Sequence, residues 1–158
     1  MDFPQRKSPR LRGYDYAQGG YYFVTVCTRK KRCSLSRIVG RGLAPAETCL
    51  TAYGAAVKEE LLALETRFPG VHIDKYVIMP NHIHAILVIG ETAGASPRPT
   101  LSDMICAFKS LTTRRCGESL FQTSFHDHII RSETDYLRIW AYIDENPAKW
   151  AEDCFYTE

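Results

Sequence analysis

Hydrophobic and polar positions follow two recurring patterns along the chain. Runs rich in aromatic and β-branched residues predict strands at 20–28, 33–39, 71–79, 82–89 and 124–131. The run at 33–39 is the weakest and follows a basic turn, where a hairpin loop is expected. The runs at 71–79 and 82–89 are separated only by Pro80-Asn81, so they are predicted to form a tight antiparallel hairpin.

Helical spacing of apolar residues predicts three helices. The first is capped by Thr48 or Thr51 and runs to about residue 67. Leu101, Ile105 and Phe108 recur at the spacing of a buried helix face. The other two helices are predicted over 101–116 and 133–145, with N-caps at Thr100 or Ser102 and at Ser132.

The order of these elements is strand, weak strand, helix, two strands, helix, strand, helix. Mixed strands and helices with a hairpin predict the α+β class, in which helices pack on an antiparallel sheet. The sequence contains no internal repeat. We therefore expect a single domain over 1–158 with a basic N-terminal arm at about 1–19.

Composition argues against several classes of protein. The chain is 45% hydrophobic and 24% charged, which is ordinary for a globular domain. Its apolar runs are far shorter than the roughly 20 residues of a membrane span, and no signal peptide is evident, so we expect a cytoplasmic protein without a membrane partner. The six cysteines form no C-x-x-C pair, which argues against a zinc ribbon and favours free, mostly buried thiols.

The net charge of +2 is unevenly distributed. Residues 1–41 hold ten Lys/Arg and two acidic residues, a net +8, so the remainder carries −6. A basic segment on an acidic body favours a polyanionic partner. Tyrosines interleave with these cations, as suits stacking on single-stranded nucleic acid; they are Tyr14, Tyr16, Tyr21 and Tyr22.

His82 and His84 stand at the start of a predicted strand. Side chains alternate along a strand, so both imidazoles point one way and Ile83 points into the core. Such a pair can hold a divalent cation if a third ligand comes from elsewhere. His126 and His128 have the same spacing and are candidates for a second ligand pair or for groups that orient the first.

The last predicted helix carries Tyr142 and Asn146 four residues apart, on one face with Ile139. This face is expected to reach a site, and the Asn146 side-chain oxygen suits a hard cation. Viewed alone, Tyr142 also fits a packing role and Asn146 a helix terminator before proline. A second face, predicted to be the core-facing one, consists of Tyr136, Trp140 and Ile143.

Five segments together resemble the single-tyrosine HUH transposases, in particular the branch called REP-associated tyrosine transposases. They are GYDYAQGGYYFVTVCT at 13–28, YVIMPNHIHAILVI at 76–89, FKS at 108–110, FHDHIIR at 125–131 and YIDENPAKW at 142–150. The resemblance covers most of the chain but not 40–68 or 90–99. It implies a ferredoxin-like sheet, the HUH endonuclease fold, with the histidines on a central strand and the tyrosine on an adjacent helix.

The resemblance also implies an activity. His82 and His84 would bind Mg²⁺ or Mn²⁺, with Asn146 as a candidate third ligand where many relatives carry Gln. Tyr142 would attack single-stranded DNA and form a 5′-phosphotyrosine, as a transposase that nicks and rejoins strands. The implied partner is hairpin DNA with REP-like palindromes. Monomer and homodimer both remain open, with the monomer favoured.

In this interpretation the cations contact the DNA backbone, and His126 and His128 are candidates for residues that hold the metal ligands in place. The predicted nucleic-acid contacts are Arg6, Lys7, Arg10, Arg12, Arg29, Lys30, Lys31, Arg32, Lys109, Arg114 and Arg115.

Two other enzyme classes fit poorly, and one binding role stays open. A histidine-triad hydrolase would need a third histidine where Ile86 stands, and two-histidine phosphoesterases need a His-x-Thr/Ser repeat that is absent. The remaining alternative is a domesticated protein that binds hairpin DNA without transposition activity. All the candidate catalytic residues are present, which favours the enzyme.

Overall fold

Strand β1 (Gly20–Cys27) lies inside the sheet and organises the fold. In the computed structural model, which describes residues 13, 15–16, 18–40, 45–90 and 98–157, β1 pairs antiparallel with β5 (His82–Ile89) on one side and with β6 (His126–Ile130) on the other. Strand β4 (Val71–Ile78) pairs antiparallel with β5, which gives the order β4-β5-β1-β6. The tight hairpin at Pro80-Asn81 is confirmed.

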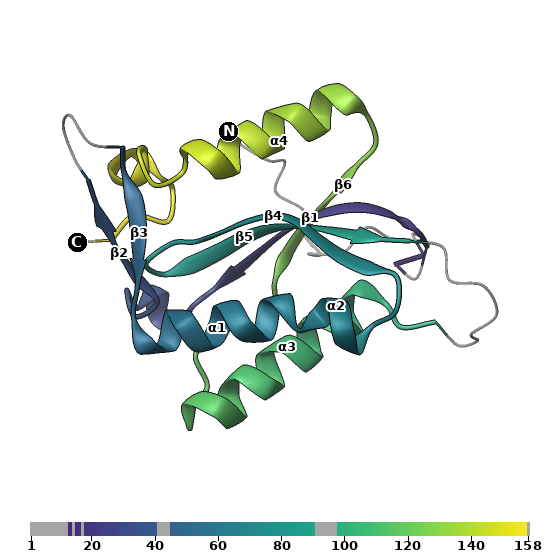
Figure 1. Cartoon of the computed structure of the whole chain (residues 1–158), viewed down its shortest axis with the longest axis horizontal. Helices are drawn as coiled ribbons and strands as arrows, with labels where there is room; N and C mark the ends of the chain where they lie inside the picture. Colours follow the sequence, from purple (N-terminus) through teal and green to yellow (C-terminus); the bar gives the residue numbers. More distant parts are fainter. Residues whose placement is uncertain (1–12, 14, 17, 41–44, 91–97, 158) are drawn as a thin grey trace.

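Helices cover both faces of this sheet. Figure 1 shows α1 (Ala52–Leu62), α2 (Leu64–Arg67) and α3 (Leu101–Cys116) below it and α4 (Glu133–Glu145) above it. The succession β1-α1-β4-β5-α3-β6, with α1 and α3 on one face, is the ferredoxin-like arrangement predicted from the sequence. Helix α4 is an addition that covers the second face.

The side chains of β5 alternate between the two faces of the sheet, and the hydrophobic core is divided into two clusters accordingly. Ile83, Ala85 and Leu87 pack toward α1 and α3 in the larger cluster. His82, His84 and Ile86 point to the α4 side. The smaller cluster there consists of Phe23, Val77, Met79, Ile86, Ile139, Ile143 and Trp150. The two histidines therefore lie at the margin of a thin apolar layer between the sheet and α4.

Side-chain caps begin the three long helices where the sequence indicates. Thr51 accepts a hydrogen bond from the Gly54 N–H, and Ser132 accepts one from the Asp135 N–H. Thr100 and Asp103 form a reciprocal capping box at α3. Of the alternatives predicted at the first two helices, the caps are thus Thr51 and Thr100.

The basic turn after β1 is not a hairpin loop, contrary to the prediction. Arg29–Lys31 forms the short 3₁₀ turn η1, and β2 (Ser36–Val39) pairs with β3 (Glu47–Leu50) in a separate two-stranded sheet. The chain leaves the main sheet because Thr28 bonds to the Asn81 carbonyl and the Arg29 N–H to the Leu120 carbonyl. Strand β3 was not predicted, since four residues carry too little pattern.

The predicted core-facing side of α4 is correct for Ile143, which is buried, and for Tyr136, which packs against the smaller cluster, but it is wrong for Trp140. Ile139 and Ile143 are buried against the sheet, whereas Trp140 is 38% exposed. The Lys75 ammonium lies 3.9 Å from the centre of the Trp140 ring and stabilises it at the outer edge of the helix. An aromatic side chain can thus occupy a half-exposed position that apolar periodicity alone assigns to the core.

The six cysteines are free thiols, as expected, but their predicted burial is wrong. Only Cys27 is buried, Cys116 is intermediate, and the exposed ones are Cys33, Cys49, Cys106 and Cys154. Among the described residues, no helix combines the length and apolarity needed to cross a membrane.

Gly54 allows α1 to approach the chain that leads into β2. A Cβ built at Gly54 would lie 2.0 Å from the Leu35 carbonyl oxygen, and the Leu35 N–H in turn bonds to the Pro80 carbonyl. We expect Gly54→Ala to lower the free energy of unfolding by about 2 kcal/mol or more, because backbone must move to remove the clash. Urea denaturation measures this.

Gly117→Ala is the matched control. Its φ of 76° strains an alanine, but nothing lies within 4 Å of the added Cβ, so we expect a loss of only about 1 kcal/mol. Equal losses for the two variants would contradict the close approach at Gly54.

Candidate active site

His82 and His84 lie together under α4, at the start of β5. Their ring centroids are 4.5 Å apart, and their residues are 0% and 1% exposed. Both project from the same face of the strand, as the sequence predicts. Two fully buried imidazoles side by side require partners, because unsatisfied buried polar groups are costly.

Each ring has one nitrogen held by a hydrogen bond. His82 Nδ1 lies 2.8 Å from Asn81 Oδ1, and the Asn81 amide nitrogen donates to the Phe155 carbonyl at 2.7 Å. The amide oxygen is thus the acceptor, so His82 Nδ1 carries the proton and Nε2 carries a lone pair. His84 Nδ1 lies 2.8 Å from Thr25 Oγ1, directly across the pairing of β5 with β1.

The two Nε2 atoms are buried without a hydrogen-bond partner. Burial lowers the pKa of His82 to about 4, although the nearby Asp153 carboxylate and Asn146 amide oppose the shift. Burial lowers the pKa of His84 well below its usual value, and His82 adds to this effect. Both rings are therefore neutral at physiological pH, the form in which imidazole binds a metal.

Asp153 completes the cluster and was missed in the sequence. Its carboxylate oxygen lies 3.8 Å from His82 Nε2, and one ligand atom from each of His82, His84 and Asp153 lies within 4.8 Å of the others. Asp153 follows the 3₁₀ turn η2 (Trp150–Glu152), in a region where the sequence has no readable periodicity. Its position depends on the return of the chain from α4 to the sheet.

Asn146, the third ligand predicted from the sequence, lies beside Asp153. Its amide nitrogen donates to Asp153 Oδ2 at 3.1 Å, while its Oδ1 is buried without a partner. Asn146 is 3% exposed at the C-terminal end of α4. The cluster thus offers two imidazole nitrogens and a carboxylate, with an amide oxygen at its edge, a donor set that fits Mn²⁺ and, less well, Mg²⁺.

Tyr142 contacts this cluster from α4. Its ring centroid lies 5.2 Å from that of His84 and 6.2 Å from that of Phe23. The tyrosine is half-buried, and α4 presents it on the side that also carries Ile139. The helix therefore brings a phenol next to the two unpartnered imidazole nitrogens.

His126 and His128 do not orient the histidine pair, although the sequence made them candidates for that role. Asn81 and Thr25 occupy that position. His128 Nε2 instead bonds to Asp135 at 2.7 Å, and His126 is exposed on β6. The i, i+2 spacing places both on the α4 face of the edge strand β6, which β1 separates from β5.

Comparison with known proteins adds independent information. No protein-family model matches the chain. An uncharacterized protein of Haemophilus influenzae is 32% identical over 97% of this chain and 94% of its own length. A REP-associated tyrosine transposase of Escherichia coli is 27% identical over 85% of this chain and 70% of its own length. A REP-associated tyrosine transposase solved bound to a REP hairpin superposes with a TM-score of 0.67 at 26% identity, over 89% of this chain and 73% of that one.

The comparisons support the REP-associated tyrosine transposase family for this chain. It has a transposase-like function of the HUH type, a class of enzymes to which its relatives belong. The letters HUH describe two histidines that flank a hydrophobic residue, here His82-Ile83-His84.

The basic residues of this chain lie in different surroundings. Arg29, Lys30 and Lys31 are exposed on η1, while Arg32 pairs with Glu118 at 3.6 Å. The predicted contacts Arg6, Lys7, Arg10 and Arg12 lie outside the described residues. Arg114 is exposed near the end of α3, and Arg115 pairs with Glu59 and Glu60 of α1.

Lys109 is engaged within the protein. Its ammonium donates to the carbonyls of Gln122, Thr123 and Ser124 at 2.7, 3.1 and 3.0 Å. Three bonds match the three donors of an ammonium group. Lys109 thus fastens the connection between α3 and β6, which is a different role from the DNA contact predicted for it.

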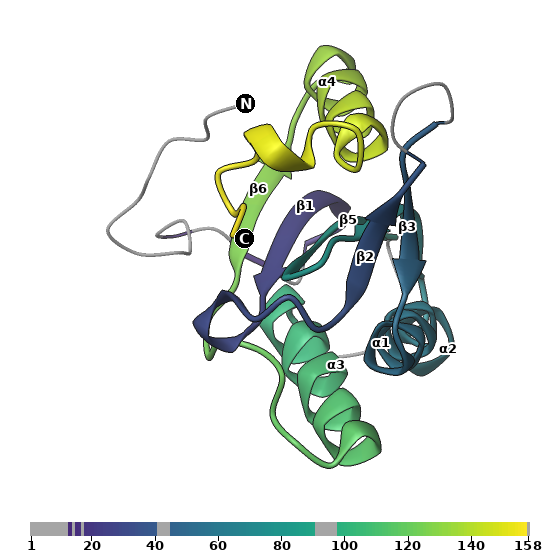
Figure 2. The same ribbon diagram turned by 90° about the vertical axis from the view of Figure 1, so that its left-hand side faces the viewer.

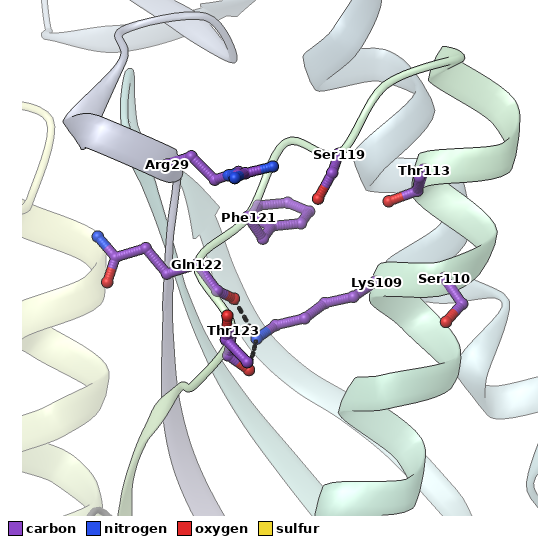
Figure 3. Close-up of a pocket in the computed structure, with 8 residues that line it drawn as sticks. All are labelled: Arg29, Lys109, Ser110, Thr113, Ser119, Phe121, Gln122 and Thr123. Carbon is purple, nitrogen blue, oxygen red and sulfur yellow. Dashed lines mark hydrogen bonds between the residues drawn. The ribbon is translucent and has the colours of Figure 1, made fainter.

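A pocket of about 440 Å³ lies beside the hydrogen bonds of Lys109 to the connection between α3 and β6. Figure 3 shows Lys109, Ser110 and Thr113 of α3 on one wall and Arg29 reaching from η1 toward Phe121 and Ser119. The pocket lies on the α3 side of the sheet and does not include the histidine cluster. Its lining is polar except for Phe121, which is itself 5% exposed.

Loss of the Asp153 carboxylate tests the cluster as a metal site. We expect Asp153→Asn to weaken Mn²⁺ binding about tenfold or more, because one anionic donor is replaced by a neutral one. Isothermal titration calorimetry measures the affinity, and the exposed neighbour Glu152→Gln is the control. An unchanged affinity in Asp153→Asn would move the third ligand to Asn146.

The lowered pKa of His82 predicts acid sensitivity in metal-free protein. The unfolded chain binds a proton on His82 near pH 6.5, whereas the folded chain binds it only near pH 4. Between these values the unfolded state holds more protons, so the free energy of unfolding falls as pH falls, by about 2 kcal/mol at pH 5 from this residue. Unfolding in chelator at pH 7 and pH 5 should show a smaller loss for His82→Gln. Equal losses would contradict the burial of a neutral His82.

Proposed function

We propose that this protein nicks and rejoins single-stranded DNA in a metal-dependent reaction, with Tyr142 as the nucleophile. The observation that carries the proposal is the contact of the Tyr142 ring with His84, beside two buried imidazole nitrogens that lack partners. A phenol, two neutral imidazoles and a carboxylate at one place suit attack on a phosphodiester.

The histidine cluster would hold the metal. His82, His84 and Asp153 supply the donor atoms, and Asn146 orients the Asp153 carboxylate or adds its own oxygen. Asn81 and Thr25 hold the imidazole rings in place. A bound Mg²⁺ or Mn²⁺ would polarise the scissile phosphate and offset the charge that develops on it.

Tyr142 performs the covalent step. Its hydroxyl oxygen forms a bond to the scissile phosphorus while the bond from phosphorus to the 3′ oxygen breaks. The phenolic proton passes to a base or to water, and the departing oxygen takes up a proton to become a free 3′-OH. One phosphoester replaces another, so a later 3′-OH can reverse the attack and join strands without ATP.

Hairpin DNA with REP-like palindromes is the proposed partner. A relative was solved bound to a REP hairpin, and the exposed cations of η1 support a similar partner here. Cys27 pairs with His82 across the sheet, and η1 begins two residues later at Arg29. The cations therefore lie at the end of the sheet where the histidines begin, which suits a strand that enters the site from that end.

A covalent adduct on a denaturing gel tests the proposal. Purified protein is incubated with labelled single-stranded hairpins from beside its own gene and with Mn²⁺. We expect an adduct that requires the metal and is lost in Tyr142→Phe and in His84→Ala, because the first lacks the nucleophile and the second a ligand.

Tyr136→Phe is the matched control, since Tyr136 is on the same helix and bonds to Asp74 instead. It should keep the adduct. An adduct that survives Tyr142→Phe would sink the assigned nucleophile. Tight hairpin binding without an adduct in any metal, across several hairpins, would favour the domesticated binding protein.

A further inference from the structure

His126 and His128 lie on one strand, but their side chains have different surroundings. His128 Nε2 bonds to Asp135 at 2.7 Å, which fastens β6 to the first turn of α4. The His126 side chain is exposed and has no hydrogen bond or ion pair to any residue that the structure describes. Imidazole is the side chain that most often transfers protons in enzymes. His126 is therefore available for a role that the proposed reaction has not yet used.

The register of the sheet places His126 in one row with a proposed metal ligand. Thr25 of β1 pairs with His84 on one side and with His126 on the other. Residues that pair directly across antiparallel strands point to the same face, so the three side chains lie together on the α4 side. Figure 2 shows β6 at the edge of the sheet beside β1, with the chain passing from it into α4. Neighbouring strands are about 4.8 Å apart, so the Cα atoms of the two histidines are about 10 Å apart, which leaves room for a phosphate between the rings.

Tyr142 approaches this row from above β1 and β5. Its ring contacts Phe23 of β1 and His84 of β5, and α4 packs on β4 and β5. His126 stands on the other side of Thr25, toward the edge of the sheet. In a displacement at phosphorus the attacking and leaving oxygens lie roughly in line, on opposite sides of the phosphorus. A phosphate held in the row can thus face Tyr142 on one side and His126 on the other.

The leaving 3′ oxygen requires a proton donor, because an alkoxide is a poor leaving group. Other groups at the cluster are committed. Asn81 holds the Nδ1 proton of His82, and Asp153 is a proposed ligand. Burial raises the pKa of the Cys27 thiol to about 11, so this thiol gives up its proton less readily than usual. His126 is the acid–base group of the row that is not committed to the metal site.

We propose that His126 is the general acid of the nicking step: its protonated ring gives a proton to the 3′ oxygen as the bond from that oxygen to phosphorus breaks. Tyr142 forms the new bond to phosphorus, so the products are a 5′-phosphotyrosine, a free 3′-OH and a neutral His126 ring. In rejoining, the neutral ring takes the proton back from the attacking 3′-OH. This inference rests on the proposed function and assigns the proton donor that the reaction needs.

A substrate with sulfur in place of the 3′ oxygen at the nicked phosphate, mapped first with wild-type protein, tests the assignment. A thiol is a far stronger acid than an alcohol, so a thiolate leaves without a proton. On ordinary DNA with Mn²⁺ we expect His126→Gln to form the adduct about a hundredfold more slowly than wild type. On the sulfur-containing DNA the two proteins should react within about threefold of each other, because the missing donor is no longer needed.

His128→Gln is the matched control, since it removes an imidazole from the same face of the same strand. It breaks the bond to Asp135 at the start of α4, so any slowing should be equal on the two substrates. Equal slowing of both substrates by His126→Gln would give His126 a binding or structural role and would overturn the inference. Unchanged rates on both substrates would overturn it as well.

Chemical modification tests the position of His126 without any nicking. Diethyl pyrocarbonate acylates accessible neutral imidazoles, and mass spectrometry locates the product. In metal-free protein saturated with the same hairpin, as judged by fluorescence anisotropy, we expect His126 to react at least about tenfold more slowly than in free protein. His72, on the opposite edge strand β4 with a side chain 64% exposed, is the internal reference and should keep its rate. An unprotected His126 would show that the DNA does not reach it and would overturn the inference.

These outcomes separate the two proposals. Wild-type protein that forms no adduct with any hairpin counts against the nicking activity itself and removes the step that His126 would serve. A wild-type adduct whose dependence on His126 is the same for oxygen and sulfur leaves the nicking activity in place and overturns only the role assigned to His126.

Discussion

The buried amide of Asn81 is the interaction on which the candidate site depends. Its oxygen fixes the proton of His82 on Nδ1, its nitrogen holds the Phe155 carbonyl, and its own carbonyl accepts from Thr28 at the end of β1. One residue thus sets which nitrogen of His82 is free of a proton, the position of Phe155 and the point where the chain leaves the sheet. The three-residue connection between β4 and β5 makes this possible, because it leaves Asn81 little freedom to move.

Helix α4 converts an open sheet into a site. A ferredoxin-like sheet with two helices on one face would leave His82 and His84 exposed on the other. The addition of α4 and η2 supplies Tyr142, Asn146 and Asp153 from sequence positions about 60 to 70 residues after the histidines. Their approach also removes water from the imidazoles, which is why the pKa values of both rings are lowered.

Much of this arrangement could be predicted from local patterns. The period of two along β5 places both histidines on one face, and the caps Thr51, Thr100 and Ser132 mark the helix starts. Features that depend on contacts between residues far apart in the sequence could not be predicted. Asp153 follows a 3₁₀ turn in a segment whose sequence shows no hydrophobic periodicity. The sequence around Asn81 predicts only a turn. From the sequence alone, Lys109 is predicted to be a cation available to DNA. The structure shows that three carbonyl groups bind its ammonium group.

The unequal size of the two core clusters affects how firmly each helix is held to the sheet. The large cluster joins the sheet to α1 and α3, whereas α4 rests on a few apolar side chains around Phe23 and Ile86. Tyr142, the proposed nucleophile, therefore lies on the layer with fewer apolar contacts, and the histidines lie on a strand that also packs in the larger cluster. A tilt of α4 would change the distance between Tyr142 and His84 while the sheet keeps its register, and the proposed attack and religation could thereby be separated in time.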